Sequence, residues 1–218
     1  MNRCLKILFF ALLVKPIVWL GLGLNIFFKA RLPKKGPAMV VANHNSHLDT
    51  MVLMSLYPLS QIHKIRPVAA ADYFLCNKVI AWFSLNIIGI IPIQRSNIRD
   101  KEALFAECHK ALDNGDILLI FPEGSRGKPE ALSALKRGIH HIIKQRSSLK
   151  VVPVMMHGLG RALPKGEKVF VPFNCDVVVG EAIPFEEDAK HYIDSVSKSL
   201  NQLLALCMTR QSIVQDEY

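Results

Sequence analysis

The sequence lacks the cysteine patterns of a disulfide-stapled or zinc-binding protein. Only five cysteines occur among the 218 residues, at Cys4, Cys76, Cys108, Cys175 and Cys207. Their number is odd and no two of them form a C-x-x-C pair, which excludes a regular disulfide framework and the common zinc motifs. The eight histidines show no metal-ligand spacing either. We therefore expect reduced thiols in a reducing compartment and no bound metal.

Acidic residues are also scarce. The chain has 18 Asp and Glu against 27 Lys and Arg, a formal net charge of +9, and 50% of its residues are hydrophobic. A basic balance suits an anionic partner, which is a nucleic acid, a membrane surface or an acidic substrate. The basic residues are dispersed and no nucleic-acid-binding motif occurs, so we expect no nucleic acid partner. The apolar N-terminal region favours a membrane.

Residues 5–28 are almost wholly apolar, which predicts a membrane-anchoring helical segment. A spanning helix needs about 20 uninterrupted apolar residues, and here Lys15 and Pro16 divide the run. A signal peptide is the least favoured of three interpretations, because Lys15 cuts the first apolar piece and no small-x-small cleavage site precedes the basic residues that follow. A single tilted span and a bent, in-plane or re-entrant anchor both stay open, and the break at Pro16 favours the second.

Four basic residues follow the apolar run, at Lys29, Arg31, Lys34 and Lys35. Each would contribute about 1 kcal/mol to the attraction of anionic lipid headgroups near the surface. By the positive-inside rule they also place the rest of the chain in the cytoplasm. We accordingly divide the chain into a membrane anchor with a basic collar, residues 1–35, and a main domain, residues 36–218.

An apolar strand followed by a polar cluster is the first candidate site. Residues 38–42 have the pattern of a buried strand, and His44, Ser46 and Asp49 come soon after it. Catalytic groups are often carried where a strand ends and a loop begins. His44 and Asp49 can meet only if His44 lies in the loop and Asp49 in the first turn of a following helix, for which Ser46 gives the start signal. A purely structural role, in which Ser46 and Asp49 cap that helix, stays open at this point.

A second stretch has the same design. Residues 116–126 begin as an apolar strand and end in Phe-Pro-Glu-Gly-Ser-Arg. Together, Asn-His-x-Ser-x-x-Asp and the later Phe-Pro-Glu-Gly-Ser-Arg closely resemble the motifs of the glycerolipid acyltransferase family, typified by 1-acylglycerol-3-phosphate (lysophosphatidic acid) acyltransferases. The resemblance covers roughly residues 36–184. The family usually has threonine where this chain has Ser125, a difference that keeps the hydroxyl group.

The resemblance implies roles for particular residues. His44 would be the general base, and Asp49 would orient it and stabilise the imidazolium. Arg95, at the end of a third apolar stretch, and Arg126 would bind the phosphate of the acceptor, because a planar guanidinium matches phosphate oxygens. The other substrate-binding residues that we predict are Glu123, Gly124 and Ser125.

The implied reaction transfers a fatty acyl group from acyl-CoA or acyl carrier protein to the free hydroxyl of 1-acyl-glycerol-3-phosphate, giving phosphatidic acid in phospholipid biosynthesis. The thioester is a co-substrate, no cofactor or metal is needed, and the lack of a G-x-S-x-G motif predicts direct attack without an acyl-enzyme. The resemblance and the basic collar together predict a protein on the cytoplasmic face of the inner or plasma membrane. Three alternatives stay open: another acceptor (glycerol 3-phosphate or another lysophospholipid), a hydrolase, and a non-enzymatic basic protein that binds a membrane or nucleic acid, the last disfavoured by the dispersed basic residues.

The fold class that we predict is α/β, with a single mixed-sheet domain of the glycerolipid acyltransferase type and an N-terminal membrane-anchoring helical segment. The site should lie on one face, at the ends of the strands. Besides the strands at 38–42 and in 116–126, the apolar pattern predicts strands at 67–71, 87–93, 151–154, 168–173 and 176–179. It predicts helices at 48–57, 73–86, 98–113, 139–145 and 186–210, the last packed on the sheet.

Overall fold

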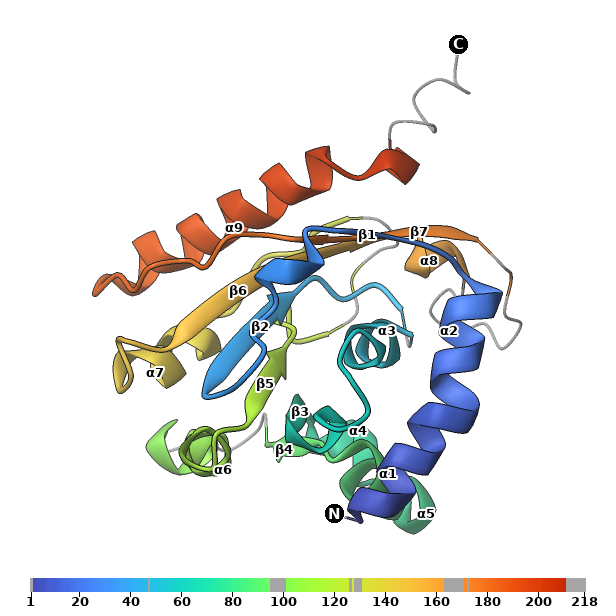
Figure 1. Cartoon of the computed structure of the whole chain (residues 1–218). Coiled ribbons are helices and arrows are strands. Elements are labelled where there is room, and N and C mark those ends of the chain that lie inside the picture. The colour runs from blue at the N-terminus through green and yellow to red at the C-terminus, as the bar shows by residue number, and fades with distance from the viewer. Residues whose placement is uncertain are drawn as a thin grey trace.

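A mixed sheet forms the centre of the molecule (Figure 1). The computed structural model describes residues 2–46, 48–94, 101–125, 127, 131–162, 171 and 173–210. Among these residues the strands are β1 (Gly23–Phe27), β2 (Ala38–Ala42), β3 (Ile65–Ala70), β4 (Ile91–Ile93), β5 (Ile117–Ile120), β6 (Lys150–His157) and β7 (Asn174–Val179). They form one sheet in the order β1-β7-β6-β2-β5-β3-β4. The strands β2 to β6 run parallel, β7 is antiparallel to β6, and β1 is parallel to β7. The predicted mixed α/β sheet is confirmed.

The two central strands, β2 and β5, are apolar and buried along almost their whole length. Parallel strands that are covered on both faces have such continuous apolar sequences. Side chains alternate between the faces, so that Val40 and Leu119 belong to one hydrophobic core and Met39 and Leu118 to the other. The sheet thus separates two cores, each of which needs a layer of helices.

Helices supply both layers (Figure 1). On one face lie α3 (Asp49–Ser55) and the N-terminal segments α1 (Arg3–Phe9), η1 (Phe10–Val14) and α2 (Lys15–Gly21). On the other face lie α6 (Lys101–Asp113), α7 (Gly138–Lys144) and α9 (Ala189–Ala205). The remaining helices of the described residues are short: η2 (Lys29–Arg31), η3 (Ile62–Lys64), α4 (Ala71–Phe74), α5 (Lys78–Phe83), η4 (Ser84–Ile88) and α8 (Leu159–Ala162). The prediction that the last helix packs on the sheet is confirmed, since Val196 and Leu200 of α9 are buried with β6 residues.

The N-terminal apolar run forms a long helix and then a strand. The helix continues from Arg3 to Gly21 through Pro16, because the π-helical segment η1, in which the Lys15 N–H bonds the Phe10 carbonyl, widens the turn beside the proline ring. By length and composition, this is the one helix in the described part of the chain that could cross a membrane.

The strand β1 follows the helix directly and pairs with β7, from Gly23 beside Asn174 to Phe27 beside Val178. The last part of the apolar run at 5–28 is therefore a strand of the sheet. The boundary that we predicted after residue 35 leaves this strand on the anchor side, because hydropathy alone does not separate a short buried strand from a membrane segment.

Two predicted elements were wrong in extent. The helix predicted at 73–86 consists of α4, α5 and η4, since α4 ends at Phe74 and the Asn77 side-chain oxygen starts α5 by accepting the Val79 N–H. The strand predicted at 87–93 begins only at Ile91, after a left-handed turn at Gly89. The start of the helix predicted at 98–113, and most of the strand predicted at 168–173, lie outside the described residues.

Candidate active site

The two polar stretches meet because their strands are neighbours. β2 and β5 are parallel and paired, with Val41 beside Ile120, so their carboxyl ends lie at the same edge of the sheet. Ligands of open α/β sheets bind outside the carboxyl ends of the strands. The loop after β2 carries His44, and the loop after β5 carries Glu123 and Gly124.

His44 and Asp49 form a hydrogen-bonded pair. The His44 Nδ1 atom lies 2.8 Å from Asp49 Oδ2. Asp49 is the first residue of α3 and its side chain is 1% exposed, whereas the His44 side chain is 21% exposed. The geometry predicted from the spacing, with His44 in a loop and Asp49 in the first turn of a helix, is confirmed.

The Asp49 carboxylate also organises the loop between the two residues. Its Oδ2 atom accepts the backbone N–H groups of Asn45, at 2.7 Å, and Ser46, at 2.8 Å. The Ser46 hydroxyl oxygen accepts the Leu48 N–H at 3.2 Å. The Ser46 hydroxyl thus bonds the turn before α3 and does not cap the helix itself, which begins after Leu48. The Asp49 carboxylate serves both this turn and the histidine. The structural and the catalytic interpretations of Asp49 are therefore compatible.

Three contacts fix the position of His44. Its imidazole stacks on the Phe121 ring, with centroids 4.3 Å apart and planes inclined by 22°. Its backbone N–H donates to Glu123 Oε1 at 2.7 Å, and its carbonyl accepts the Gly127 N–H at 3.1 Å. The loop after β5 thus holds the loop after β2 through the backbone and the ring of His44.

Glu123 joins two loops from a buried position. Its side chain is 3% exposed, and while Oε1 accepts the His44 N–H, Oε2 accepts the Ser133 N–H at 2.9 Å. Both carboxylate oxygens are therefore engaged by the backbone. This geometry favours a positioning role for Glu123 over the substrate contact that the sequence predicts.

The backbone at Gly124 lies close to the side chain of Lys136. Its φ of 73° is in the left-handed region, and a Cβ atom at this residue would lie 2.8 Å from the Lys136 Nζ atom. The Lys136 backbone N–H also donates to the Pro122 carbonyl at 2.8 Å. The ammonium of Lys136 therefore lies over this loop. Ser125, the next residue after Gly124, is exposed at the surface.

Arg95 and Arg126, the two predicted phosphate-binding residues, lie outside the described residues. Their assignment stays a prediction.

Sequence reasoning gave no role to Asn43 or Phe121, whereas for Lys136 it left a phosphate or carrier contact and a solvated surface position both open. Asn43 connects β2 to β6, because its side-chain amide donates to the Met156 carbonyl and accepts the Met156 N–H, both at 2.7 Å. Asn43 follows a buried apolar strand directly, and this position could have predicted that its amide bonds a neighbouring strand. Phe121 gave no such signal, since its partner His44 is distant in sequence.

Comparison with known proteins places this fold in a family. The model of the family described as Acyltransferase matches residues 24–157, more than half of the chain. The chain belongs to the acyltransferase family. The matched residues include both loops of the candidate site and the pair His44 and Asp49.

The acyltransferase is similar to curated proteins from plants, algae and animals. It is 27% identical over 158 residues to the 1-acyl-sn-glycerol-3-phosphate acyltransferase LPAT1, chloroplastic, of Arabidopsis thaliana, which covers 69% of this chain and 42% of that protein. It is 28% identical over 169 residues to the 1-acyl-sn-glycerol-3-phosphate acyltransferase CHLREDRAFT_174358 of Chlamydomonas reinhardtii, with 77% and 48% covered. It is 26% identical over 185 residues to the human 1-acyl-sn-glycerol-3-phosphate acyltransferase alpha, with 83% and 63% covered. The chain thus spans about half the length of these relatives.

A solved structure has the same fold. The crystal structure of the 1-acyl-sn-glycerophosphate (LPA) acyltransferase PlsC from Thermotoga maritima superposes with a TM-score of 0.70 at 18% sequence identity. The match covers 88% of this chain and 77% of that one. The predicted glycerolipid acyltransferase-type fold is confirmed.

Proposed function

We propose that this acyltransferase transfers a fatty acyl group from a thioester to the free hydroxyl of 1-acyl-glycerol-3-phosphate, which yields phosphatidic acid. The observation that carries the reaction type is the contact of 2.8 Å between His44 Nδ1 and the buried carboxylate of Asp49. The acceptor is supported by the printed names of the relatives, which are 1-acyl-sn-glycerol-3-phosphate acyltransferases.

In the proposed reaction, His44 acts as the general base. Asp49 accepts the Nδ1–H of the imidazole and thereby leaves Nε2 as the proton acceptor. As the acceptor's hydroxyl oxygen attacks the thioester carbonyl, its proton moves to Nε2 and a C–O bond forms. The tetrahedral intermediate then collapses, the C–S bond breaks, and the imidazolium returns the proton to the leaving thiolate. The Asp49 carboxylate stabilises the imidazolium between these steps.

Glu123 would support this chemistry indirectly. It holds the His44 backbone, and a base that is misplaced by about 1 Å can lose a hundredfold in rate. In this proposal Glu123 is a positioning residue that does not touch the substrate.

The acceptor's phosphate would bind at the loop after β5. Arg126 and Arg95 are the predicted ligands, and Lys136 adds an exposed ammonium beside Gly124. Guanidinium and ammonium groups both bind phosphate oxygens, the first in bidentate fashion and the second as a point charge. We therefore include Lys136 in the proposed phosphate site.

We propose acyl-CoA or acyl carrier protein as the donor and the cytoplasmic surface of a membrane as the place of reaction, without a cofactor. The donor would arrive from the aqueous side and the acceptor from the lipid side. This arrangement requires the site to lie close to the bilayer.

The His44→Ala variant tests the proposal. We expect transfer of labelled acyl groups to fall by about 10²–10⁴-fold, because the general base is lost. The assay offers acyl-CoA and acyl carrier protein as donors, each against lysophosphatidic acid, glycerol 3-phosphate and other lysophospholipids. The variant His191→Ala, an exposed histidine of α9, is the matched control and should keep full activity.

The outcomes separate the alternatives. Phosphatidic acid that depends on His44 and forms from lysophosphatidic acid alone supports the proposal. A His44-dependent product from another acceptor keeps the chemistry and changes the substrate, whereas release of free fatty acid without a lipid product indicates a hydrolase. Normal transfer by His44→Ala would exclude the proposed mechanism.

A further inference from the structure

One face of the His44 imidazole is covered by an aromatic ring. The rings of His44 and Phe121 have centroids 4.3 Å apart and planes inclined by 22°. Asp49 binds the same imidazole at its edge, where Oδ2 lies 2.8 Å from Nδ1. Neither contact involves Nε2, the atom that would accept the proton. The imidazole is therefore held at one edge and on one face, and 21% of the side chain stays exposed.

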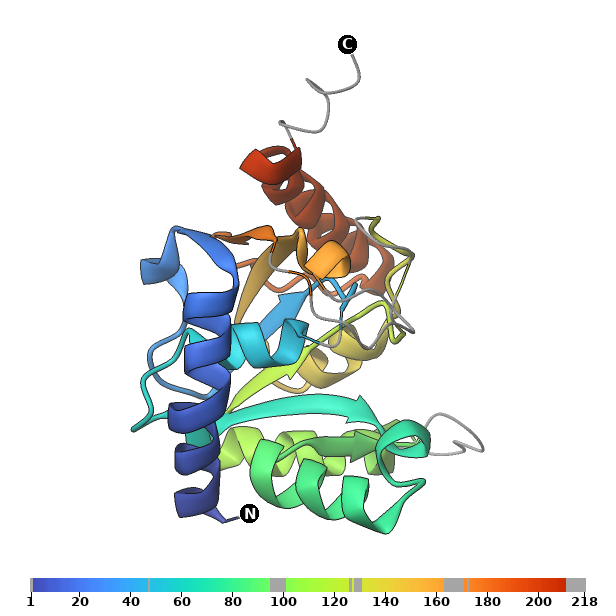
Figure 2. The ribbon, with the colours of Figure 1, turned by 90° about the vertical axis from the view of Figure 1, so that its right-hand side faces the viewer.

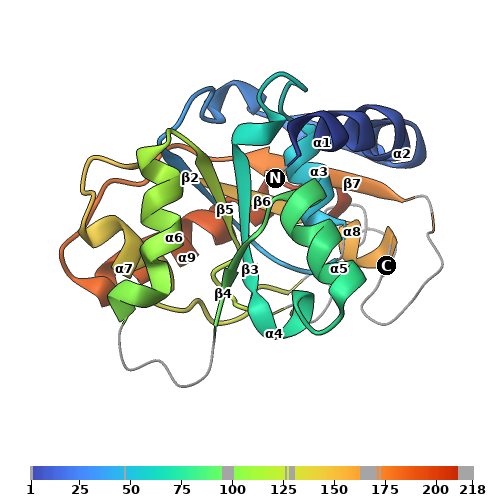
Figure 3. The ribbon, with the colours of Figure 1, turned by 90° about the horizontal axis from the view of Figure 1, so that it is seen from below.

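The register of the central strands brings the two rings together. β2 and β5 are paired in parallel up to Val41 and Ile120. Because side chains alternate along a strand, Ala42 at the end of β2 and Phe121 just after β5 belong to the same hydrophobic core. His44 follows Ala42 by two residues, and its ring lies on that of Phe121. Figure 2 shows α3, the helix that begins at the partner of His44, over this face of the sheet, and Figure 3 shows α6 and α7 on the other face.

The ring of Phe121 is itself well supported. Its side chain is half-buried and packs against the hydrophobic core that contains Val40, Val52 and Leu119. Its carbonyl accepts the Gly124 N–H at 3.0 Å, which closes the turn at the start of the loop after β5. The imidazole therefore lies on a ring that the core and the turn hold in place.

The hydrogen bond to Asp49 does not by itself fix the plane of the imidazole. The ring can still tilt about the line that joins His44 Nδ1 to Asp49 Oδ2, and a tilt moves Nε2. A flat contact on one face opposes this tilt, because the two rings would clash on one side and separate on the other. A displacement of about 1 Å at a reacting group can cost a hundredfold in rate, so the direction of Nε2 matters.

The face of Phe121 also lies next to a charge that appears only during the reaction. In the proposed mechanism His44 is neutral before proton transfer and is an imidazolium afterwards. The face of a phenyl ring is negative and attracts a cation that lies within about 6 Å of its centre. An interaction that is stronger in the transition state than in the ground state raises kcat and does not change substrate affinity.

We propose that Phe121 is a positioning residue that acts through His44: its aromatic face directs Nε2 toward the acceptor's hydroxyl group and stabilises the imidazolium. The inference rests on the acyl transfer proposed above and adds a residue to that reaction. It requires an aromatic face at this residue, and not only an apolar side chain of similar size.

Two substitutions separate the aromatic face from apolar size. Phe121→Leu keeps an apolar side chain without an aromatic face, and we expect it to lower kcat by about threefold to thirtyfold with a nearly unchanged KM for the acceptor. Phe121→Tyr keeps the face and should restore most of kcat. A raised KM with normal kcat in Phe121→Leu would overturn the proposal, because it would indicate a contact with the substrate.

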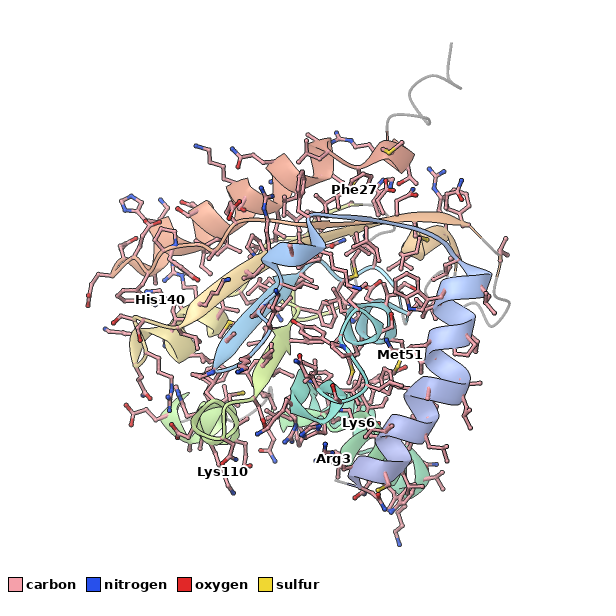
Figure 4. The ribbon with its side chains drawn as sticks, in the orientation of Figure 1. Arg3, Lys6, Phe27, Met51, Lys110 and His140 are labelled. Atoms are coloured by element: carbon pink, nitrogen blue, oxygen red, sulfur yellow. The ribbon has the colours of Figure 1, made fainter. Side chains whose placement is uncertain are left out.

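The matched control is Phe185→Leu, which should keep the kcat of the unsubstituted chain. Phe185 also stacks on a histidine, His140, with centroids 6.0 Å apart and planes inclined by 17°. This second stack is remote from the site, since His140 of α7 and Met51 of α3 lie on opposite sides of the sheet (Figure 4). Thermal unfolding of both leucine variants shows whether each is folded.

Fluorinated phenylalanines in place of Phe121 test the charge directly. Fluorine nearly preserves the shape of the ring and withdraws electrons from its face, so the attraction of a cation weakens with each added fluorine. We expect log kcat to fall steadily with the number of fluorine atoms, while the KM and the melting temperature stay constant. A kcat that does not respond to fluorination would overturn the proposal and leave Phe121 a packing role.

An NMR measurement tests the stack without any reaction. The ring current of Phe121 should move the signals of the His44 ring protons upfield, and these signals are identified by their loss in His44→Ala. We expect Phe121→Leu to move them downfield and Phe185→Leu to leave them in place. His44 signals that are the same in Phe121→Leu and in the unsubstituted chain would overturn the proposal.

A double substitution separates this inference from the function on which it rests. If Phe121 acts through His44, Phe121→Leu should lower transfer no further in the His44→Ala chain. An equal fold-loss with and without His44 would overturn the proposal. Normal transfer by His44→Ala would refute the proposed function and this role with it, although the NMR signals would still report the stack. His44-dependent transfer that does not respond to fluorination would refute the role of Phe121 alone.

Discussion

Glu123 holds the loop that carries His44, the proposed general base. One of its oxygens accepts the His44 N–H and the other the Ser133 N–H, from loops that are distant in sequence. A carboxylate whose two oxygens both accept backbone N–H groups positions a loop, whereas one that binds a substrate hydroxyl contributes to substrate affinity. The two roles affect kcat and KM differently.

We expect Glu123→Gln to lower kcat by roughly tenfold to a hundredfold and to leave the KM for the acceptor nearly unchanged. The amide can accept only one of the two backbone N–H groups, so the other loses its partner at a cost of about 1–3 kcal/mol. Steady-state kinetics with varied acceptor concentration measures both constants. Glu187→Gln, at an exposed glutamate, is the control. A raised KM with normal kcat would restore the substrate-binding role that the sequence suggests.

The pair His44 and Asp49 could be predicted because its geometry is local. A loop followed by the first turn of a helix brings residues five apart together, and the capping signal at Ser46 located that turn. The bonding of Glu123 could not be predicted, because its partners are backbone N–H groups, which any residue type supplies. Nor did the sequence indicate that Lys6 and Lys15 turn inward, since their acceptors are backbone carbonyls elsewhere in the fold.

A buried polar cluster fastens the end of the described chain to the sheet. Asp176 of β7 accepts the N–H and hydroxyl of Thr209 through Oδ2, at 2.7 and 2.8 Å, and the Asn25 amide through Oδ1 at 2.9 Å. His157 of β6 contacts the Thr209 hydroxyl at 2.6 Å. Three strands and the segment after α9 thus share one cluster.

We expect Thr209→Val to lower the free energy of unfolding by about 1–3 kcal/mol, because it removes the hydroxyl from buried polar partners. Thermal unfolding of the chain in detergent, followed by circular dichroism, measures the change. Met208→Ala replaces the exposed neighbouring side chain and should leave the melting temperature unchanged. If Thr209→Val and Met208→Ala had the same melting temperature as the unsubstituted chain, the cluster would not stabilise this segment.

At the element scale, the central strands were predictable and the sheet edge was not. β2 and β5 are short, continuous apolar runs between polar ends, which is the pattern of covered parallel strands. β1 has no such borders, because it continues the apolar run of the helix before it. Its pairing with β7 depends on contacts between residues that are about 150 positions apart, which a local sequence pattern does not reveal. The division of the predicted helix at 73–86 depends on the cap at Asn77. Because apolar residues lie on both sides of Asn77, the pattern alone predicted one continuous helix.

The N-terminal segment belongs to the structural core of the whole molecule. Phe10, Val14, Val18 and Leu22 are buried in the same cluster as β2 and α3. Burial of such side chains contributes about 1.5–3 kcal/mol each, or about 6–12 kcal/mol together. This sum is comparable with the total stability of a typical domain, about 5–15 kcal/mol.

We therefore expect deletion of residues 1–29 to yield an aggregated chain, and not a soluble, active domain. The deletion would also leave β7 without its neighbour β1. Size-exclusion chromatography and circular dichroism of the truncated and full-length chains in the same detergent measure the outcome. A folded, monodisperse truncated chain would mean that the segment is a dispensable anchor.

Only Leu22 separates the end of α2 from the start of β1, and this residue is buried. No flexible tether joins the N-terminal helix, the membrane anchor that the sequence predicts, to the sheet whose loop carries His44. With that helix as the anchor, the height and tilt of the site above the lipid would be constants of the fold, and a lipid acceptor would reach the site by diffusing in two dimensions with its headgroup already aligned. Turnover would then depend on the number of acceptor molecules per unit area of membrane, and we expect added inert lipid at constant bulk concentration to slow the reaction.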